Sequence, residues 1–554
     1  MIFSSPFQIE IPQQDLLSFL FASDRFQEDD AVWLSPSNPT VTVTKGKARQ
    51  LAQQIGYSLR SRGIGQHRPG HDVVIHFVEN QVMIAPTEFG TLCAEGICAT
   101  CPPTATAFEL ARQMNLSGPK ILICSPQTRA VAEDALRQCE LKELPELMVM
   151  HSPTLDIKEA RTGQTILTSQ QLSWKPITDP AVLADRTACL IYSSGTTGLP
   201  KGVRLSHANF VANIKQIMYH FEPRYRLIRS EGRYPAMPGV LPNSNAAGVI
   251  LHAMLPLAIG WQVYQVPKYD LPLLMEYVRK FRLSVLFLAP AIWQRIVNEY
   301  TKDDLKSVRF GMSGGSLLTN DLRSAVSDMF PEGIGLICNW GMTEATCEAT
   351  QFPLHEIDTE ESTGRLMPNM LAKVIDEKGS ELGKGQMGEL CIKGPNVTKG
   401  YFNNAKATAD AFTHDGFLKT GDIAVVGQDE KVFIKGRYKE LIKYKGNQVP
   451  PVELESVIIT VPGVRDVGVI GVPQGDGNEL PRAYVVRESA ACTTDAINDA
   501  IKLRLANHKW LRGGVRWVDE IPRNTIGKID RKILGQWCEG ETRVNGGTSL
   551  TARL

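Results

Sequence analysis

A run of small and hydroxyl-bearing residues, YSSGTTGLPKGV, occupies Tyr192 to Val203 directly after an apolar segment. Its glycines allow backbone N–H groups to converge on an anion, its serines and threonines add donors, and Lys201 adds positive charge. A glycine-rich surface turn is the alternative interpretation. The density of donors immediately after a predicted buried strand favours a phosphate-binding loop.

This loop does not have the Walker A pattern. That motif places Gly directly before the Lys and Ser or Thr directly after it. Here Pro200 precedes Lys201 and Gly202 follows it. A P-loop NTPase is therefore a poor fit.

Further motifs follow in a fixed order along the chain: NWGMTE (339–344), GELCIKGPNVTKGYFN (388–403), KTGD (419–422), GRYKELIKYKGNQVPPVELE (436–455) and PRNTIGKIDRK (522–532). Together with the first loop they resemble the signature of the acyl-adenylate-forming superfamily, from about Thr42 to Lys532. That superfamily includes acyl-CoA synthetases, coumarate-type CoA ligases, firefly-type luciferases and peptide-synthetase adenylation domains. The resemblance implies that a carboxylate attacks the α-phosphate of ATP, giving acyl-AMP and pyrophosphate, and that CoA then accepts the acyl group.

Anionic repulsion dominates such a barrier, so the site needs cations and N–H donors. The resemblance assigns the β- and γ-phosphates to the first loop: Ser193, Ser194, Gly195, Thr196, Thr197 and Lys201. It assigns Mg2+ to Glu344, since that hard cation prefers oxygen ligands, and the α-phosphate to Thr343. Outside the motif, Glu344 would read as a solvated surface carboxylate.

The resemblance also places the nucleoside. Trp340 would stack on adenine, where the family usually has Tyr or another aromatic residue. Asp422 would accept both ribose hydroxyls and Arg437 would assist there. Taken singly, Trp340 would be a core residue, and the two charged residues would form a surface ion pair.

A small mobile lid is implied next. Lys528 would bridge the substrate carboxylate and the α-phosphate during adenylation. Rotation about a hinge at Lys439 would then withdraw Lys528 and present the KYKGNQ segment. In that second pose Lys443 and Gln448 would act near the adenylate, and Gly446 would let the CoA pantetheine arm pass close to the backbone.

The acyl pocket departs from the pattern. Many CoA ligases of this family carry PFFHxYG where this chain has PNSNAAG (242–248). By position Asn245 replaces the His and Ala247 replaces the Tyr, which indicates either drift in a loop or a wider, more polar pocket; Gly314 and Gly315 are assigned to the same pocket. The stretch holds no Asp to bind an α-amino group, which argues against an amino-acid-activating domain.

The pattern along the chain predicts an α/β fold. A helix is expected over Thr42 to Arg62, and short apolar strands then alternate with helices as far as about Gln351, which indicates mostly parallel sheet. From Leu371, closely spaced strands and Gly turns indicate a small β-rich subdomain. We expect a large domain over 1–435, a small α+β lid domain over 436–537, and a flexible tail over 538–554.

Composition excludes some classes of function. The net charge of +1 provides no field that would attract nucleic acid. The 11 cysteines suit a reducing compartment, and the Cys98–Cys101 pair is interpreted as buried thiols because no second pair or redox context accompanies it. The uncharged stretch 234–267 is interrupted by prolines, so it is interpreted as buried strand and helix rather than a membrane span.

The chain ends in Ala552-Arg553-Leu554, which resembles the Ser-Lys-Leu address for the peroxisomal import receptor. Peroxisomal localisation is expected, with the cytoplasm as the alternative. The expected activity is that of an ATP-dependent carboxylate–CoA ligase. The alternatives are transfer of the acyl group to an amine or a carrier protein, a non-catalytic binding protein on the same fold, and a generic ATPase.

Overall fold

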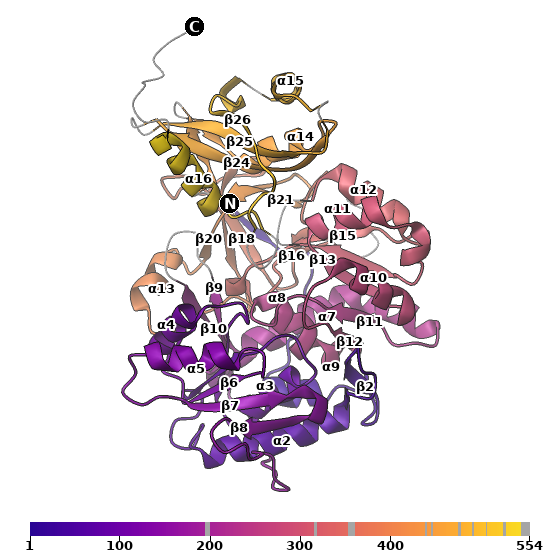
Figure 1. Cartoon of the computed structure of the whole chain (residues 1–554), viewed down its shortest axis with the longest axis vertical. Coiled ribbons are helices and arrows are strands. Elements are labelled where there is room, and N and C mark those ends of the chain that lie inside the picture. Colours follow the sequence, from indigo (N-terminus) through magenta and orange to yellow (C-terminus); the bar gives the residue numbers. More distant parts are fainter. Residues whose placement is uncertain are drawn as a thin grey trace.

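The computed structural model describes residues 1–193, 200–314, 318–352, 360–437, 440–444, 447–474, 478–489, 492–505, 507–523 and 528–544. Three α/β sheets and one β-rich sheet form the larger part, and a smaller α+β part lies beyond them at one end of the long axis (Figure 1). The predicted fold class is confirmed. The domain boundaries stay predictions. Strand β21 (Val432–Arg437) runs across the expected boundary at residue 435.

The first sheet has seven strands in the order β10-β9-β5-β4-β6-β7-β8. Their bounds are β4 Val73–Phe77, β5 Ile97–Thr100, β6 Ile121–Cys124, β7 Glu146–His151, β8 Asp156–Glu159, β9 Thr187–Ser193 and β10 Lys201–Ser206. The inner strands from β9 to β7 pair in parallel, and the two outermost strands pair antiparallel. Buried on both faces, β4 to β6 are near-continuous apolar runs, as inner parallel strands require.

Two further sheets complete the α/β part. One has the order β11-β12-β2-β3, with β2 Ala31–Leu34, β3 Thr42–Thr44, β11 Ala236–Gly239 and β12 Gln262–Gln265. The other has the order β13-β14-β15-β16-β17, with β13 Val285–Leu288, β14 Phe310–Ser313, β15 Leu336–Trp340, β16 Thr350–Gln351 and β17 Arg365–Leu366. The strands β13 to β15 are parallel, so their carboxyl ends lie along one edge.

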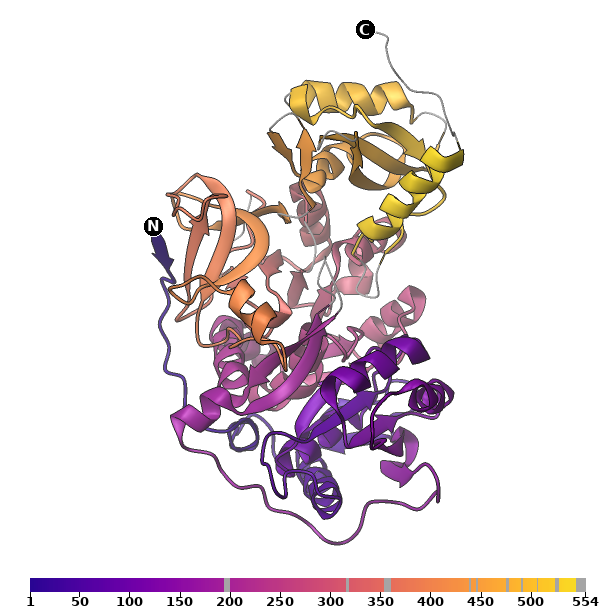
Figure 2. The same ribbon diagram turned by 90° about the vertical axis from the view of Figure 1, so that its left-hand side faces the viewer.

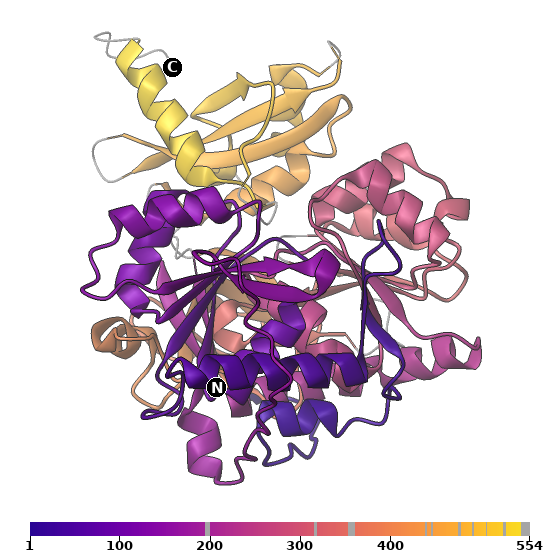
Figure 3. The ribbon, with the colours of Figure 1, turned by 60° about the horizontal axis from the view of Figure 1, so that its bottom comes forward.

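Helices connect and cover these sheets (Figures 1 and 3). Their bounds are α1 Leu16–Phe21, α2 Lys45–Ser61, α3 Ile84–Cys93, α4 Ala107–Ser117, α5 Arg129–Gln138, α6 Pro180–Asp185, α7 His207–Ser230, α8 Ala246–Gly248, α9 Leu255–Ile259, α10 Leu271–Lys280, α11 Pro290–Glu299, α12 Asn320–Met329 and α13 Ala405–Ala411. Single-turn helices are η1 Ser152–Thr154, η3 Lys302–Leu305 and η4 Thr343–Ala345, and η2 Val249–Met254 is a π-helix.

The first predicted helix begins later than expected. Thr42–Thr44 is strand β3, paired antiparallel with β2, and the helix starts at Lys45. These β-branched residues favour a strand. Thr44 then caps the helix, because its hydroxyl accepts from the Lys47 backbone N–H at 3.1 Å.

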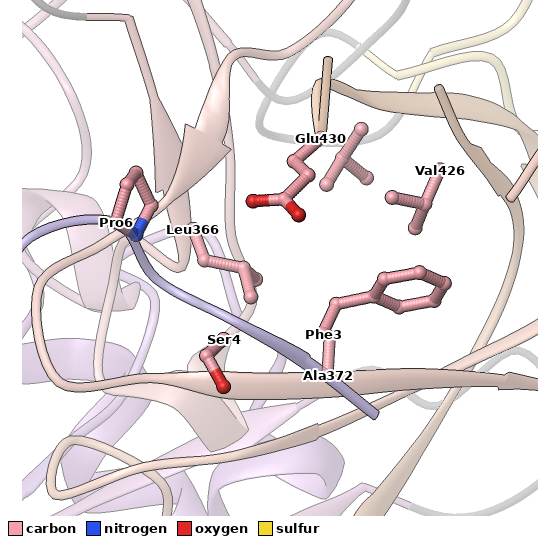
Figure 4. Close-up of a pocket in the computed structure, with 8 residues that line it drawn as sticks. Phe3, Ser4, Pro6, Leu366, Ala372, Val426 and Glu430 are labelled. Carbon is pink, nitrogen blue, oxygen red and sulfur yellow. The ribbon is translucent and has the colours of Figure 1, made fainter. Parts of the chain in front are cut away.

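The β-rich sheet has the order β1-β18-β19-β20-β21 and is antiparallel throughout. Its remaining strands are β18 Leu371–Ile375, β19 Met387–Lys393 and β20 Leu418–Val426, and the N-terminal strand β1 (Ile2–Ser4) pairs with β18. Figure 2 shows the N-terminus beside this sheet. A pocket at the junction is lined by Phe3, Ser4, Pro6, Leu366, Ala372, Val426, Glu430 and Val432 (Figure 4). It lies at a packing seam with one charged lining residue, Glu430, so we do not take it as the active site.

The uncharged stretch 234–267 forms β11, α8, η2, α9 and β12 and is largely buried. The prediction of buried strand and helix is confirmed. Within the described residues, no helix combines the length and the apolar character needed to cross a membrane.

The smaller part begins with the hairpin β22 (Ile442–Tyr444) and β23 (Asn447–Val449). It continues with α14 Pro451–Ile458, β24 Val464–Pro473, β25 Glu479–Arg487, α15 Thr494–Arg504, η6 Asn507–Lys509, β26 Gly514–Trp517 and α16 Arg531–Val544. Strands β24, β25 and β26 form its sheet, with β25 and β26 parallel.

The expected tail over 538–554 is wrong for residues 538–544, because α16 continues to Val544. Leu534 and Cys538 on this helix are buried. Glu541, one turn further, accepts from Arg482 and Arg516 at 3.1 Å each. An apolar face followed by an ion pair extends the helix past the point where the sequence pattern weakens.

Arg531 anchors the start of α16. Its guanidinium contacts both carboxyl oxygens of Glu455 at 2.7 and 2.8 Å and the Glu440 carboxylate at 3.0 Å. All three side chains are largely buried, and Arg531 and Glu455 are the more enclosed.

We expect Arg531→Met to destabilise the smaller part by about 3 kcal/mol, because it leaves the buried Glu455 without its countercharge. Hydrogen exchange of the α14 and β24 backbone amides measures this loss. Arg516→Met is the matched control; its half-exposed pair with Glu541 should contribute less than about 1 kcal/mol. Equal losses in the two variants would contradict the assignment.

Candidate active site

Lys201 of the predicted phosphate loop and the predicted metal ligand Glu344 both contact one tyrosine. The Lys201 ammonium lies 4.9 Å from the centroid of the Tyr401 ring. The Tyr401 hydroxyl donates to Glu344 Oε1 at 3.0 Å. Glu344 is buried, and its carbonyl accepts from the Thr398 N–H at 2.8 Å. Tyr401 therefore joins a cation and a carboxylate that are far apart in sequence.

The chain folds to bring Tyr401 here by pairing its segment with β10. Val203 and Tyr401 form an isolated antiparallel bridge, and the Phe402 N–H donates to the Gly202 carbonyl at 2.8 Å. Gly400, with a φ of 137°, allows the turn into this pairing. Tyr401 is a residue that the sequence analysis did not assign, although it lies inside the quoted GYFN motif.

A second cluster surrounds Asp422. On β20 and β21, Asp422 is the pairing partner of Arg437, and Arg437 Nε lies 3.0 Å from Asp422 Oδ1. From the end of β15, the Trp340 indole N–H donates to Asp422 Oδ2 at 3.0 Å. Burial raises the pKa of Asp422, and the Arg437 charge and the indole hydrogen bond offset part of that rise. The contact between Trp340 and Asp422 was not expected from the sequence.

Lys528 belongs to the same neighbourhood. Burial and the nearby Arg437 charge lower its pKa, while Asp422 and Glu440 act in the opposite direction. Glu440 is also bonded to Arg531, three residues after Lys528. The structure thus brings Lys528, Asp422 and Arg437 together across the two parts of the chain.

The other lid residues are placed differently. Lys443 is exposed on β22, and its backbone N–H donates to Glu479 Oε2 at 3.0 Å. Gln448 is the β23 pairing partner of Lys443. Thr343 is half-buried in η4, beside Glu344.

Several predicted residues lie outside the described residues: Ser194, Gly195, Thr196, Thr197, Gly315, Lys439, Gly446 and Ala552 to Leu554. The side chains of Ser193 and Gln448 also lie outside them. The roles assigned to these residues stay predictions.

The predicted pocket stretch 242–248 is held against the first sheet by polar side chains. Asn80 donates to the carbonyls of Gly239 and Leu241 at 2.8 and 2.9 Å, and its Oδ1 accepts from the Asn243 N–H at 3.1 Å. Asn243 Nδ2 donates to Glu88 Oε1 at 2.8 Å. The sequence analysis assigned neither Asn80 nor Glu88, and no local pattern marks them.

Inside this stretch, Asn245 is an N-cap. Its Oδ1 accepts from the Gly248 N–H at 2.9 Å and so begins α8. A Cβ on Gly248 would lie 2.0 Å from the Pro242 carbonyl oxygen, so this turn needs glycine. Ala247 is half-buried and packs on the core.

At the end of β14, Gly314 lies against β15. A Cβ there would come within 2.3 Å of Asn339 Oδ1. Gly314 therefore lets the two strands end with Asn339 filling the space beside it.

Comparison with known proteins covers nearly the whole chain. Residues 22–402 match the AMP-binding enzyme family, and residues 453–528 match the AMP-binding enzyme C-terminal domain. A relative from Emericella nidulans, named as an acyl-coenzyme A synthetase, is 36% identical over 545 residues, covering 95% of this chain and 96% of the relative. A phenylacetyl-CoA ligase of Aspergillus niger is 30% identical over 550 residues, covering 96% of this chain and 98% of the relative.

Solved structures agree in fold. The ATP-bound crystal structure of MatB from Rhodopseudomonas palustris superimposes with a TM-score of 0.79 at 27% identity, covering 94% of this chain and 98% of that chain. The amide bond synthetase McbA from Marinactinospora thermotolerans has a TM-score of 0.78 at 21% identity, covering 94% of this chain and 98% of that chain. At that identity the second likeness concerns the fold alone.

Glu88 generates a prediction about stability and pH. Burial raises its pKa from 4.5 to about 8. The neighbouring His76, with Nδ1 4.0 Å away, has a pKa lowered by burial to about 4, so it is uncharged above pH 5. Between pH 5 and 8 the folded protein keeps a proton on Glu88 that the unfolded chain releases. This group therefore lowers the free energy of unfolding as pH rises, by up to about 1.4 kcal/mol per pH unit.

Glu88→Gln removes that contribution, so the variant should gain stability relative to the unchanged protein as pH rises from 5 to 8. Urea midpoints across this range measure the difference. Glu133→Gln, at an exposed ion pair with Arg129, is the control and should leave the pH dependence as it was. A pH-independent difference for Glu88→Gln would show that Glu88 is ionised in the fold.

Proposed function

This chain belongs to the AMP-binding enzyme family, and from that premise we propose that it is an ATP-dependent carboxylate–CoA ligase. It activates a carboxylic acid as acyl-AMP with release of pyrophosphate and then transfers the acyl group to CoA. The observation that carries the proposal is the convergence of Lys201, Glu344, Asp422, Arg437 and Lys528 around the segment from Trp340 to Glu344. Relatives named as an acyl-coenzyme A synthetase and as CoA ligases, 30–36% identical over almost the full chain, support CoA as the acceptor.

A carboxylate is a poor acyl donor because its leaving group would be an oxide. Attack on the α-phosphate of ATP supplies AMP as the leaving group, and the main obstacle is repulsion between anions. Lys201 brings positive charge to the mouth of the phosphate loop. The Tyr401 ring packs against that lysine, and the Tyr401 hydroxyl donates to Glu344, so one side chain sets the cation and the carboxylate on either side of it.

The ribose would bind at Asp422. Its two oxygens offer about four lone-pair sites, and the contacts with Trp340 and Arg437 occupy one on each oxygen. The carboxylate can thus accept two ribose hydroxyls while these partners keep it oriented. The Trp340 ring would lie against the adenine.

Mg2+ fits Glu344 by the chemistry of the donor. This cation is usually held by one or two carboxylates and completes its shell with water and phosphate oxygens. When bound it would offset charge on the phosphates. Thr343, beside Glu344, would donate to the α-phosphate.

The lid would act in two poses. In the pose observed, Lys528 lies near Asp422 and Arg437, where it would bridge the acid carboxylate and the α-phosphate. A turn about Lys439 would replace it with the β22–β23 hairpin, with Lys443 and Gln448 near the adenylate and Gly446 beside the pantetheine arm. We also propose peroxisomal import through Ala552-Arg553-Leu554, with the cytoplasm as the alternative.

The first test is pyrophosphate release from ATP and Mg2+ with a panel of aryl, fatty and dicarboxylic acids, each with and without CoA. We expect release that requires an acid, turnover that rises with CoA, and a thioester product. Acid-dependent release that is indifferent to CoA would favour an amine or carrier-protein acceptor. Release without any acid would indicate a generic ATPase, and no release with any acid would favour a binding protein.

Tyr401→Phe should raise the Mg2+ concentration needed for half-maximal rate by about tenfold, because a hydrogen bond to a charged group contributes about 1.5 kcal/mol. The phenyl ring of Tyr401→Phe keeps the contact with Lys201. Tyr401→Ala removes that contact as well, so its rate should fall further than that of Tyr401→Phe. Initial rates across a Mg2+ titration at saturating ATP measure this. An unchanged Mg2+ dependence in Tyr401→Phe would contradict the role given to the hydroxyl.

A further inference from the structure

Glu348 is a buried carboxyl group whose place in the fold is otherwise unexplained. Its side chain is 1% exposed, and among the described residues neither carboxyl oxygen has a hydrogen-bond partner at good distance and angle. Burial raises its pKa to about 8, and hydrogen bonding with the Asn339 side chain, the one polar side chain that acts on this carboxyl within the described chain, offsets part of that rise. A buried polar group without partners costs free energy, so its presence calls for a reason.

The backbone of Glu348 is held firmly. Its N–H donates to Asn213 Oδ1 at 3.3 Å, and its carbonyl accepts from Asn213 Nδ2 and Asn396 Nδ2 at 2.9 and 3.0 Å. Asn213 lies on α7 and is itself bonded to Gln216. Glu348 is therefore set in place by buried amides, and its carboxyl is not the chance result of a loose loop.

Further polar side chains converge on the same spot. Asn339 on β15 and Gln351 on β16 are pairing partners, so their side chains lie on one face of the sheet. Gln351 is also 1% exposed, and its Oε1 has no hydrogen-bond partner within the described part of the chain. Asn339 in turn lies against Gly314. Glu348 and Gln351 thus bring three oxygens near Asn339 whose capacity to accept hydrogen bonds is not filled by well-formed bonds within the described chain.

This cluster is next to the reacting groups. Asn339 directly precedes Trp340, and the Ala349 N–H donates to the Trp340 carbonyl at 2.9 Å. Glu348 lies on the same connection as Glu344. The parallel strands β14 and β15 end here, and ligands of α/β sheets bind at the carboxyl ends of such strands.

We propose that Glu348, with Asn339 and Gln351, is a specificity subsite that binds a hydrogen-bond donor, a hydroxyl or an amine, carried by the acid that this enzyme activates. The proposal rests on the ligase function above and narrows its substrate class. Unused acceptors in a buried site favour a ligand that supplies donors, and they disfavour a purely hydrocarbon chain because that chain would leave them unpaired. The substrate is thus a hydroxy or amino acid derivative whose donor lies away from the reacting carboxylate.

The test compares matched acids that differ at one end. Straight-chain acids of increasing length are each supplied with a terminal methyl, hydroxyl or amino group, along with phenylacetic acid and its ring-hydroxylated form. The ratio of kcat/KM for the donor-bearing acid to that for its plain counterpart is measured by pyrophosphate release. We expect a ratio above about ten at the length that fits, since one well-placed hydrogen bond to a buried acceptor is worth about 1.4 kcal/mol or more.

Two variants of Glu348 separate its contribution as a hydrogen-bond acceptor from its contribution as a charged group. Glu348→Leu should bring the ratio below one by raising activity on plain acids, and it should raise the melting temperature because the unpaired carboxyl is gone. Glu348→Gln should keep the preference for a hydroxyl and lose the preference for an amine, because a bound ammonium can pair with Glu348 once that carboxyl gives up its proton, whereas Gln cannot become charged. Cys347→Ala, a buried neighbour in the same turn, is the control and should leave the ratio unchanged.

A preference of the unchanged protein for plain acids at every length would overturn the proposal, as would an unchanged ratio in Glu348→Leu. Should Glu348→Leu fail to fold, Glu348→Gln alone decides, because an amine preference that survives it rules out the carboxyl as the partner. Failure of the ligase function looks different, since it abolishes acid-dependent pyrophosphate release for every acid in the panel.

Discussion

The Asp422 carboxylate is the interaction on which the rest of this site depends. It receives the Trp340 indole from one sheet and the Arg437 guanidinium from its own sheet. Lys528, from the other part of the chain, lies in the same electrostatic neighbourhood. A buried carboxylate needs compensating donors, and here those donors come from the groups that would bind a nucleotide. The requirement to pair Asp422 therefore also assembles the site.

The same rule explains the differences between the other buried acids. Glu344 is partnered by Tyr401, and this pairing ties the phosphate-loop lysine to the segment after β15. Glu88 on α3 is paired on one oxygen by Asn243 and so ties the pocket stretch to that helix. Glu348 differs because its surroundings leave both oxygens without a hydrogen bond within the described chain. Asp422, Glu344 and Glu88 each have at least one well-formed hydrogen bond or ion pair, whereas Glu348 has none of good geometry within the described residues, and this difference supports its proposed role in binding a ligand.

The smaller part is organised so that Lys528 moves with its surroundings. Arg531 ties the start of α16 to Glu455 and to Glu440, next to the expected hinge. Lys528 lies between Arg523, which bonds Asp466, and Arg531. Ion pairs at Arg523 and Arg531 thus tie the chain before and after Lys528 to the smaller part, so a rotation of that part would carry the lysine in or out of the site.

Much of the fold follows from the sequence by itself. The short apolar runs of β4, β6 and β9 are typical of inner strands of a mostly parallel sheet, and the closely spaced glycines after Leu371 are typical of an antiparallel sheet with short turns. Lys201 could be named as a phosphate-binding candidate from its loop, and Glu344, Asp422 and Lys528 could be named as candidates because their motifs resemble those of the acyl-adenylate-forming superfamily. The helix start at Lys45 and the extension of α16 to Val544 were missed, because pairing with β2 and the contacts of Glu541 are made with distant residues.

Tertiary structure decided what those candidates touch. No local pattern marks Tyr401 as the link between Lys201 and Glu344, or Trp340 as a donor to Asp422, because each contact joins residues that are distant along the chain. The burial and the hydrogen bonding of Glu348 also depend on residues that are distant along the chain. From the sequence, Glu348 would be expected to be a solvated side chain. The packing of α7, β15 and β16 around it excludes water and leaves its carboxyl without a well-formed hydrogen bond within the described residues. The sequence determines which groups are available for chemistry, whereas burial, which is a property of the whole fold, determines their charge and what is left for a substrate to satisfy.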